Sequence, residues 1–143
     1  MKKIYLFTFI ILVLFAFAAC STDTTPATDG NATENTTSAA ITYEQITPEE
    51  AKSIMDSDAE YILIDARTDE EFAAGHIAGA IMIPEYEIAD RAETELPEKD
   101  ALILVYCRSG RRSKIASEEL AKLGYTNVRE FGGIIDWPYE IVQ

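Results

Sequence analysis

The sequence predicts an α/β fold in which helices cover both faces of a parallel sheet. From residue 41 to residue 143, apolar runs of strand length alternate with segments that have helix caps or helical periodicity. The runs are nearly continuous in apolar residues, a pattern typical of strands that are buried on both faces. Ligands in such sheets bind beyond the carboxyl ends of the strands, so residues at those ends are the first candidates for a site.

The predicted domain begins with a short strand at residues 41–46, followed by a helix that extends to about residue 56. Thr47 caps this helix, Pro48 takes its first position, and Glu50 completes a capping box. Together these three residues are a strong signal for the start of a helix.

The next elements repeat this order. Residues 61–65 form an apolar run of strand length. Thr68 and Glu71 then form a second capping box, which opens a short helix that ends at Gly75. Residues 80–84 predict another short strand.

The C-terminal half continues the alternation. An acidic segment at residues 85–100 is expected to be helical in its first half, and residues 101–106 are the most strand-like run in the chain. Residues 113–123 predict a helix whose apolar side chains share one face. A last strand at residues 127–131 and a closing helix or turn at residues 134–142 complete the predicted domain.

The length and charge of the chain limit its function. A chain of 143 residues suits one ordinary domain and not two. Its formal net charge of −13 argues against nucleic acid as a partner, because a phosphate backbone requires a positive surface. We expect a tethered domain of this size to be a monomer.

The N-terminus predicts export. Two lysines precede an uncharged apolar run in residues 1–19, which is the layout of a secretory signal peptide and is shorter than the about 20 residues of a membrane-spanning helix. Cys20 follows, and its placement resembles the lipobox of bacterial lipoproteins, although Phe17 stands where leucine is usual. The resemblance implies that a lipid on Cys20 anchors the exported protein to the bacterial cell membrane. A plain signal peptide and an uncleaved anchor helix are the alternatives.

Residues 20–40 are rich in threonine and hold no large apolar side chain. Such a segment cannot bury surface, so we expect a disordered tether. It leaves residues 41–143 for the folded domain, with Cys107 as the only cysteine beyond the one predicted to be lipidated. A single cysteine cannot form an internal disulfide, so Cys107 is either an inert buried thiol or a reactive one.

Cys107 stands between the most strand-like run and the next predicted helix, at the start of the segment C-R-S-G-R-R-S. A helix N-terminus offers unpaired N–H groups and partial positive charge, and Gly110 allows a tight loop that points N–H groups inward. Both features favour the thiolate, which is the nucleophilic form of cysteine. Basic side chains at the start of a helix are unfavourable because they repel the positive end of the helix dipole. A thiolate and an anionic substrate in the loop would offset this repulsion. The alternative is a buried apolar cysteine followed by a solvated turn.

Three segments resemble the rhodanese family of sulfurtransferases: residues 65–84 resemble its second signature, residues 107–113 its active-site loop and residues 131–137 its closing segment. The resemblance covers residues 41–143 and implies a five-stranded parallel sheet with helices on both faces. It also implies that a thiolate takes a sulfane sulfur from an anionic donor such as thiosulfate and passes it to a thiol or cyanide acceptor. No metal or organic cofactor is implied, because the protein itself carries the sulfur.

The resemblance makes Cys107 the nucleophile and persulfide carrier. It implies that six loop residues bind the substrate, through backbone N–H groups around the sulfur or through guanidinium groups: Arg108, Ser109, Gly110, Arg111, Arg112 and Ser113. Asp65 and Arg67 match its D-x-R motif, and we interpret them as an ion pair that supports the loop rather than as part of the site mouth. His76 is expected to be a structural turn residue, since a thiolate that the loop already ionises needs no base.

Two other functions remain open. Cysteine phosphatases and some arsenate reductases use a similar cradle, but their H-C-x5-R motif has its arginine six positions after the cysteine, where this chain has Ser113. The same motif has a histidine where this chain has Tyr106. Alternatively, the domain is a non-catalytic persulfide carrier or binding module.

Overall fold

The computed structural model of the chain describes residues 42–143. The predicted signal peptide at residues 1–19, the predicted lipidation of Cys20 and the predicted tether at residues 20–40 lie outside the described residues. Within the described part, no helix combines the length and the hydropathy that crossing a membrane requires.

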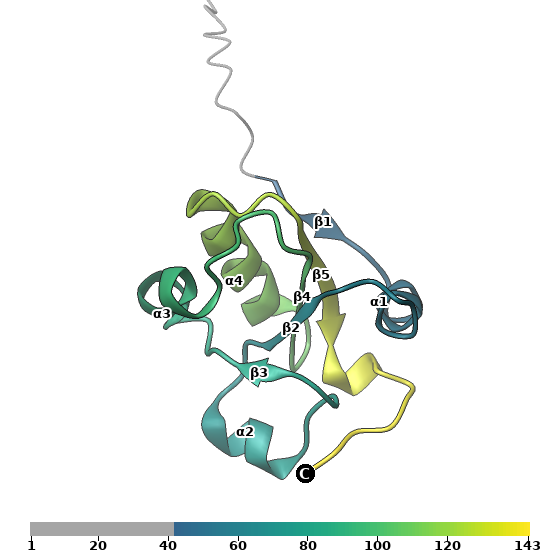
Figure 1. Cartoon of the computed structure of the whole chain (residues 1–143). Helices are drawn as coiled ribbons and strands as arrows, with labels where there is room; N and C mark the ends of the chain where they lie inside the picture. The colour runs from purple at the N-terminus through teal and green to yellow at the C-terminus, as the bar shows by residue number, and fades with distance from the viewer. Residues whose placement is uncertain (1–41) are drawn as a thin grey trace, which may run out of the picture. The chain divides into compact units, whose positions relative to one another are not determined.

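The described residues form a five-stranded parallel sheet, which confirms the predicted fold class (Figure 1). The strands are β1 (Glu44–Gln45), β2 (Ile62–Asp65), β3 (Ile81–Met82), β4 (Ile103–Cys107) and β5 (Val128–Gly133). In space they follow the order β1-β5-β4-β2-β3, and each adjacent pair is parallel. β4 therefore lies in the middle of the sheet, and all of its residues are buried.

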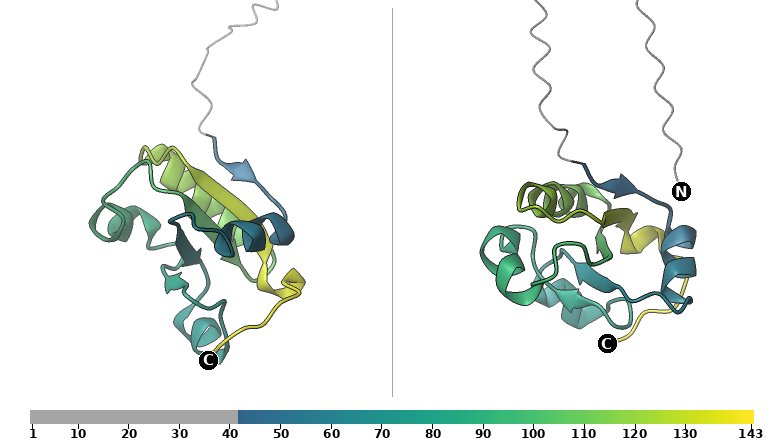
Figure 2. Two further views of the ribbon diagram at one scale, coloured as in Figure 1. Left: turned by 45° about the vertical axis from the view of Figure 1, so that its right-hand side comes forward. Right: turned by 45° about the horizontal axis from the view of Figure 1, so that its top comes forward.

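Helices connect the strands and cover both faces of the sheet, as predicted. Those in the described residues are α1 (Pro48–Met55), α2 (Asp69–Ala74), α3 (Ile88–Glu95), α4 (Arg111–Lys122) and a short 3-10 helix, η1 (Ile134–Asp136). Figure 2 shows α3 and α4 on one side of the sheet and α1 on the other.

Both predicted capping boxes are present. In α1 the Thr47 hydroxyl accepts from the Glu50 N–H at 3.1 Å, and the Glu50 carboxylate accepts from the Thr47 N–H at 2.8 Å. In α2 Thr68 and Glu71 exchange the same two kinds of hydrogen bond. These bonds satisfy N–H groups that have no partner inside the helix, so each helix begins where its cap predicts.

α4 begins at Arg111, two residues before the predicted start at residue 113. Its N-cap is Gly110, which has a left-handed φ of 94°. Glycine adopts this conformation without the steric cost that a Cβ would bring. Gly110 makes no side-chain cap hydrogen bond, so the signal that locates α1 and α2 in the sequence is missing here.

Alternating residues of β4 face two separate apolar clusters. Val105 and Cys107 belong to the cluster that α3 and α4 cover, whereas Leu104 and Tyr106 belong to the cluster under α1. The central strand therefore directs Cys107 to the α4 side of the sheet.

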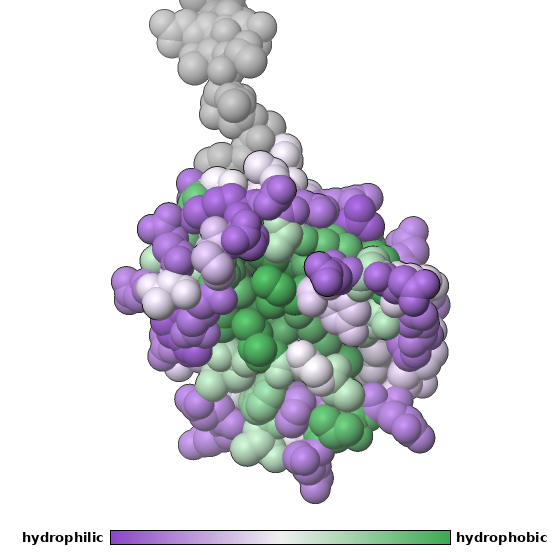
Figure 3. All heavy atoms as spheres, in the orientation of Figure 1, coloured by the Kyte–Doolittle hydropathy of each residue, from purple (hydrophilic) through white to green (hydrophobic). Residues whose placement is uncertain are grey.

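On the face seen in Figure 1, apolar surface gathers over the middle of the domain and hydrophilic residues surround it (Figure 3).

The segment after β5 is only partly helical, whereas the sequence predicts a closing helix or turn over residues 134–142. η1 ends at Asp136, and Pro138 follows closely, where its missing N–H cannot extend a helix. Near the C-terminus, Val142 exchanges two backbone hydrogen bonds of 2.8 Å with His76. The last residues thus pack as an extended segment beside the end of α2.

Leu104→Ala is expected to lower the free energy of unfolding by about 3 kcal/mol, because truncating a fully buried leucine loses apolar burial and leaves a cavity. Urea denaturation of the variant and the wild type measures the difference. Ile115 on α4 is 42% exposed, so Ile115→Ala should cost less than about 1 kcal/mol in the same assay. Equal losses in the two variants would contradict the central position of β4.

Candidate active site

Cys107 is the last residue of β4, and only a short loop separates it from the start of α4. Its side chain is 1% exposed. The Gly110 N–H donates to the Cys107 sulfur with 3.2 Å between nitrogen and Sγ. The structure therefore brings together the two features that the sequence places there, a thiol and the N-terminus of a helix with an inward-facing amide.

Two opposing effects act on the pKa of the Cys107 thiol. Burial of the thiol raises it. The N–H groups of Ser113, Ser109 and Gly110 lower it, and the Ser113 hydroxyl lowers it further only when its proton turns toward the sulfur. The balance leaves the pKa of Cys107 below its ordinary value, which favours the nucleophilic thiolate.

β5 supports the loop by lying close beneath it. A Cβ on Gly133 would collide with the carbonyl group of Arg108 and the Cα of Ser109, so glycine is needed for this close approach. Cys107 pairs with Gly133 after a shift in the β4–β5 register. The N–H of Ile135 in η1 also donates to the Arg108 carbonyl, at 3.3 Å. The loop backbone is thus held from below along its first residues.

The three arginines of the loop have different environments. Arg112 forms a two-point ion pair with Glu71, with N···O distances of 2.6 and 2.9 Å. Arg108 and Arg111 are exposed, and in the described part of the chain neither forms an ion pair. Arg108 and Arg111 are therefore available to an anion from solvent, whereas Arg112 is already bound.

Glu71 joins α2 to the loop. Its carboxylate caps α2 through Thr68 and also receives both bonds from Arg112. The hydrogen bond from Arg112 is the largest influence on this carboxyl, and it outweighs burial to lower the pKa of Glu71 to about 2. Sequence reasoning finds Glu71 only as a cap, because its pairing with Arg112 arises from the packing of two helices far apart in the chain.

Asp65 and Arg67 form a buried ion pair at the end of β2. Asp65 is fully buried, and the Arg67 guanidinium donates to its carboxylate at distances between 2.6 and 3.0 Å. Arg67 also donates to the Gly75 carbonyl at 2.7 Å, and the Tyr106 hydroxyl donates to Asp65 at 2.6 Å. Burial and this bond to Asp65 raise the pKa of Tyr106, which keeps it a neutral donor. The pair thus joins the end of β2 to the end of α2 and to β4, and its support of the loop stays a prediction.

His76 lies between α2 and the C-terminal segment. Its Nδ1 is 3.0 Å from the Phe72 carbonyl oxygen, and its ring stacks on the Phe72 ring with 3.8 Å between centroids. These contacts match the structural role that the sequence predicts for it. In the described part of the chain, no three His, Cys, Asp or Glu side chains are grouped as metal ligands.

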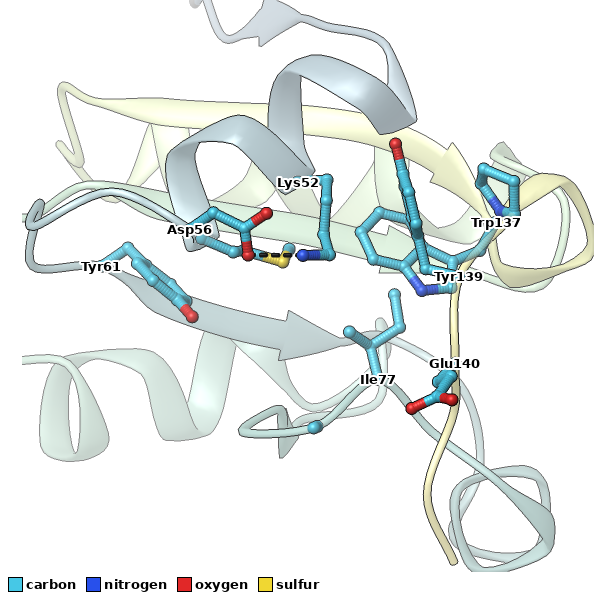
Figure 4. A pocket seen from close by; sticks show the side chains of 10 residues that line it. Lys52, Asp56, Tyr61, Ile77, Trp137, Tyr139 and Glu140 are labelled. Carbon is cyan, nitrogen blue, oxygen red and sulfur yellow. Dashed lines mark hydrogen bonds and ion pairs between the residues drawn. The ribbon is translucent and has the colours of Figure 1, made fainter.

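A cavity of about 700 Å³ lies on the α1 side of the sheet (Figure 4). Its walls include Lys52, Met55, Tyr61, Ile77, Trp137 and Tyr139. Trp137 packs against Phe131 with 5.6 Å between ring centroids, and its indole N–H has no hydrogen-bond partner among the described residues. Cys107 belongs to the apolar cluster on the other side of the sheet, so this cavity is separate from the sulfur site.

Glu130 in β5 is a polar residue of the site that sequence reasoning misses. It is 3% exposed, and its carboxylate accepts from the Ser113 hydroxyl at 2.6 Å and from the Gly132 N–H at 2.9 Å. The only signal in the sequence is an acidic residue inside a predicted strand. That signal does not show whether the side chain faces solvent or the loop.

Comparisons with known proteins place this geometry in context. Residues 47–138 match the family model of the rhodanese-like domain. The chain is 42% identical over 73 residues to the thiosulfate sulfurtransferase PspE of Escherichia coli (strain K12), across 51% of this chain and 70% of PspE. It is 35% identical over 104 residues to the adenylyltransferase and sulfurtransferase UBA4 of Candida albicans, across 68% of this chain and 24% of UBA4. Among solved structures, a rhodanese with anions from E. coli superposes with a TM-score of 0.56 at 38% identity, across 59% of this chain and 99% of that one.

Glu71→Gln is expected to lower the free energy of unfolding by about 2 kcal/mol at pH 7, because glutamine retains a capping side chain but loses the ion pair with Arg112. The pKa of Glu71 falls from 4.5 to about 2 on folding, so this stabilisation is complete above pH 4.5 and is lost as the pH falls toward 2. Urea denaturation at pH 7 and pH 3 should therefore show a smaller difference from wild type at pH 3. Glu70→Gln, a change at the exposed neighbour, is the control. A difference of equal size at both pH values would contradict the ion pair.

Proposed function

The chain belongs to the rhodanese-like domain family, and from this premise we propose that it is a sulfurtransferase that carries a sulfane sulfur as a persulfide on Cys107. The observation that carries the proposal is the bond from the Gly110 N–H to the Cys107 sulfur at the start of α4. A backbone cradle of this kind stabilises an anion on one side-chain atom. Sulfur transfer needs that stabilisation twice, first for a thiolate and then for a persulfide anion.

The proposed reaction consists of two displacements. The Cys107 thiolate attacks the outer sulfur of thiosulfate, the S–S bond of thiosulfate breaks, and sulfite leaves with the bonding electron pair. The persulfide anion then gives its outer sulfur to an acceptor such as a thiolate or cyanide, and the Cys107 thiolate is the leaving group. Charge is conserved in both steps and no proton is transferred, so the N–H groups of the loop can support the chemistry without a general base.

Arg108 and Arg111 are the proposed contacts for the anionic group of the donor. Both are exposed beside Cys107. A chain with a net charge of −13 needs local positive charge to attract an anion, and these side chains supply it at the loop. Arg112, which Glu71 holds, is proposed to fix the loop to α2 instead.

A phosphatase or an arsenate reductase has less support. The position of its phosphate-binding arginine is taken by Ser113, which is fully buried. The nearest arginine, Arg112, already donates two bonds to Glu71. A non-catalytic persulfide carrier shares the loop geometry with the enzyme and differs from it in turnover.

Incubation of the full chain with thiosulfate is expected to add one sulfur atom to Cys107, detected by mass spectrometry of the tryptic peptide 100–108. Cyanide should remove this sulfur as thiocyanate. Cys107→Ser should gain no sulfur, whereas Cys20→Ser, the matched change at the other cysteine, should gain as much as wild type.

The outcome of this experiment separates the three functions. A persulfide that turns over with cyanide supports the enzyme, and a persulfide without turnover indicates a carrier. Absence of added sulfur, together with hydrolysis of an aryl phosphate that depends on Cys107, would contradict the proposal in favour of a phosphatase.

Arg111→Ala is expected to raise KM for thiosulfate by about three- to tenfold and to change kcat by less than about twofold, because it removes a charge that attracts the donor before the reaction. Thiocyanate formation at varied thiosulfate concentration measures both constants. The increase in KM should shrink at high ionic strength, where exposed charges are screened. Lys122→Ala removes a cation from the other end of α4 and should change neither constant. A fall in kcat with an unchanged KM would assign Arg111 to the reaction step instead.

A further inference from the structure

Glu130 is a buried carboxylate directly beneath the active-site loop. In the described part of the chain it forms no ion pair with a lysine or an arginine. Its Oε1 accepts from the Ser113 hydroxyl at 2.6 Å and from the Gly132 N–H at 2.9 Å, and its Oε2 is 3.5 Å from the amide nitrogen of Gln45. A Cβ built on Gly110 would lie 3.9 Å from Oε1, so the carboxylate lies against the loop. A buried charge without an ion pair depends on such hydrogen bonds for its stability.

Ser113 has one hydroxyl proton and several acceptors for it: the Glu130 carboxylate is nearest at 2.6 Å, and the carbonyl oxygens of Gly110 and Gly132 lie at 3.1 and 3.3 Å. Its side chain is fully buried in the first turn of α4, where it contacts Glu130 and also lies in position to hydrogen-bond Cys107. A distance of 2.6 Å between two oxygen atoms is typical of a hydroxyl that donates to a carboxylate. The proton therefore lies toward Glu130, and in that position it is not available to the sulfur.

Other charged and titratable groups surround this pair. They come from the segment before β1, from α4 and from η1: Tyr43, Arg112, Lys114 and Asp136. Burial and the carboxylates of Glu118 and Glu130 raise the pKa of Tyr43, so Tyr43 is neutral at pH 7. Lys114 and Asp136 carry opposite charges and line a shallow cavity with Glu130, while Arg112 faces the thiol but is bound elsewhere. Ser113 thus provides the direct link between the carboxylate and the thiol.

We propose that Glu130 is a positioning residue that acts through Ser113, because its carboxylate holds the hydroxyl proton away from Cys107 and limits how far the loop stabilises the sulfur anion. This inference rests on the proposed function and adds to it a residue that tunes the reactivity of the Cys107 thiolate. A thiolate that is stabilised less is a stronger nucleophile toward a sulfur donor. The N–H groups of the loop favour the ionised form of Cys107. Because the Ser113 hydroxyl donates to Glu130 and not to the sulfur, the thiolate keeps more of its nucleophilicity.

Glu130→Gln tests the inference, since glutamine keeps the shape and an acceptor oxygen for the Gly132 N–H but removes the charge. The rate at which iodoacetamide alkylates Cys107 in the full chain is measured against pH at the tryptic peptide 100–108. The midpoint of this profile is expected to fall by about one pH unit, the effect of one charge-assisted hydrogen bond gained by the thiolate. The limiting rate at high pH is expected to fall about threefold, because nucleophilicity decreases with pKa.

A residue that only braces the loop gives the opposite result. Loss of such a brace would loosen the N–H groups around the sulfur, so the midpoint would rise. An unchanged or raised midpoint in Glu130→Gln therefore overturns the inference. Glu118→Gln removes an exposed charge from α4, and as the matched control it should leave the profile unchanged.

Changes at Ser113 test whether the effect passes through its hydroxyl. Ser113→Ala is expected to move the midpoint by less than about 0.3 pH unit when Glu130 is present, but to raise it by about one unit in the Glu130→Gln background. Ser113→Thr keeps the hydroxyl and should reproduce the serine protein in both backgrounds, with circular dichroism to verify each fold. Equal shifts from Ser113→Ala in both backgrounds would show that Glu130 does not hold the proton, and would overturn the inference.

The alkylation profiles report on the thiol alone and need no sulfur transfer. If thiosulfate adds no sulfur to Cys107, the proposed function fails while the profiles still test the role of Glu130. If the profiles contradict that role, the persulfide experiment is unaffected.

Discussion

One constraint governs this structure: the backbone N–H groups between β4 and α4 must face a single buried sulfur atom. A buried anion is unfavourable unless hydrogen bonds replace the water it has lost. The start of α4 supplies N–H groups that have no partner inside the helix, together with the positive end of the helix dipole. In the proposed function, an anion on Cys107 accepts hydrogen bonds from these N–H groups, and its negative charge offsets the arginines at the start of the helix.

The surrounding residues serve to keep the loop in that conformation. Gly133 allows β5 to lie directly beneath the loop backbone, where any side chain would collide with it. The ion pair between Arg112 and Glu71 ties the first turn of α4 to α2, and Glu130 accepts a bond from Ser113 in the same turn. Because these contacts come from both β5 and α2, the fold itself fixes the conformation of the loop, which is the preorganisation that the proposed sulfur transfer requires.

The elements with local signals could be predicted from the sequence. Apolar runs locate the strands, the caps at Thr47 and Thr68 locate α1 and α2, and the position of Cys107 after a buried strand locates the loop. The start of α4 is placed two residues late, because Gly110 caps it through a positive φ and not through a side chain. The partners of the loop have no local signal: Arg112 and Glu71 are 41 residues apart, and which face of β5 carries an acidic residue inward is decided only when the sheet is assembled.

The central claim, that inward-facing N–H groups hold a sulfur anion on one buried side chain, is tested most directly by titrating the thiolate itself. The ultraviolet absorbance of the thiolate is recorded against pH for the wild-type chain, and the titration of Cys107→Ser is subtracted to remove the other cysteine. This account predicts a pKa for Cys107 below 9.0, the ordinary value of the thiol. A pKa at or above 9.0 would show that burial outweighs the N–H groups, and would contradict the account.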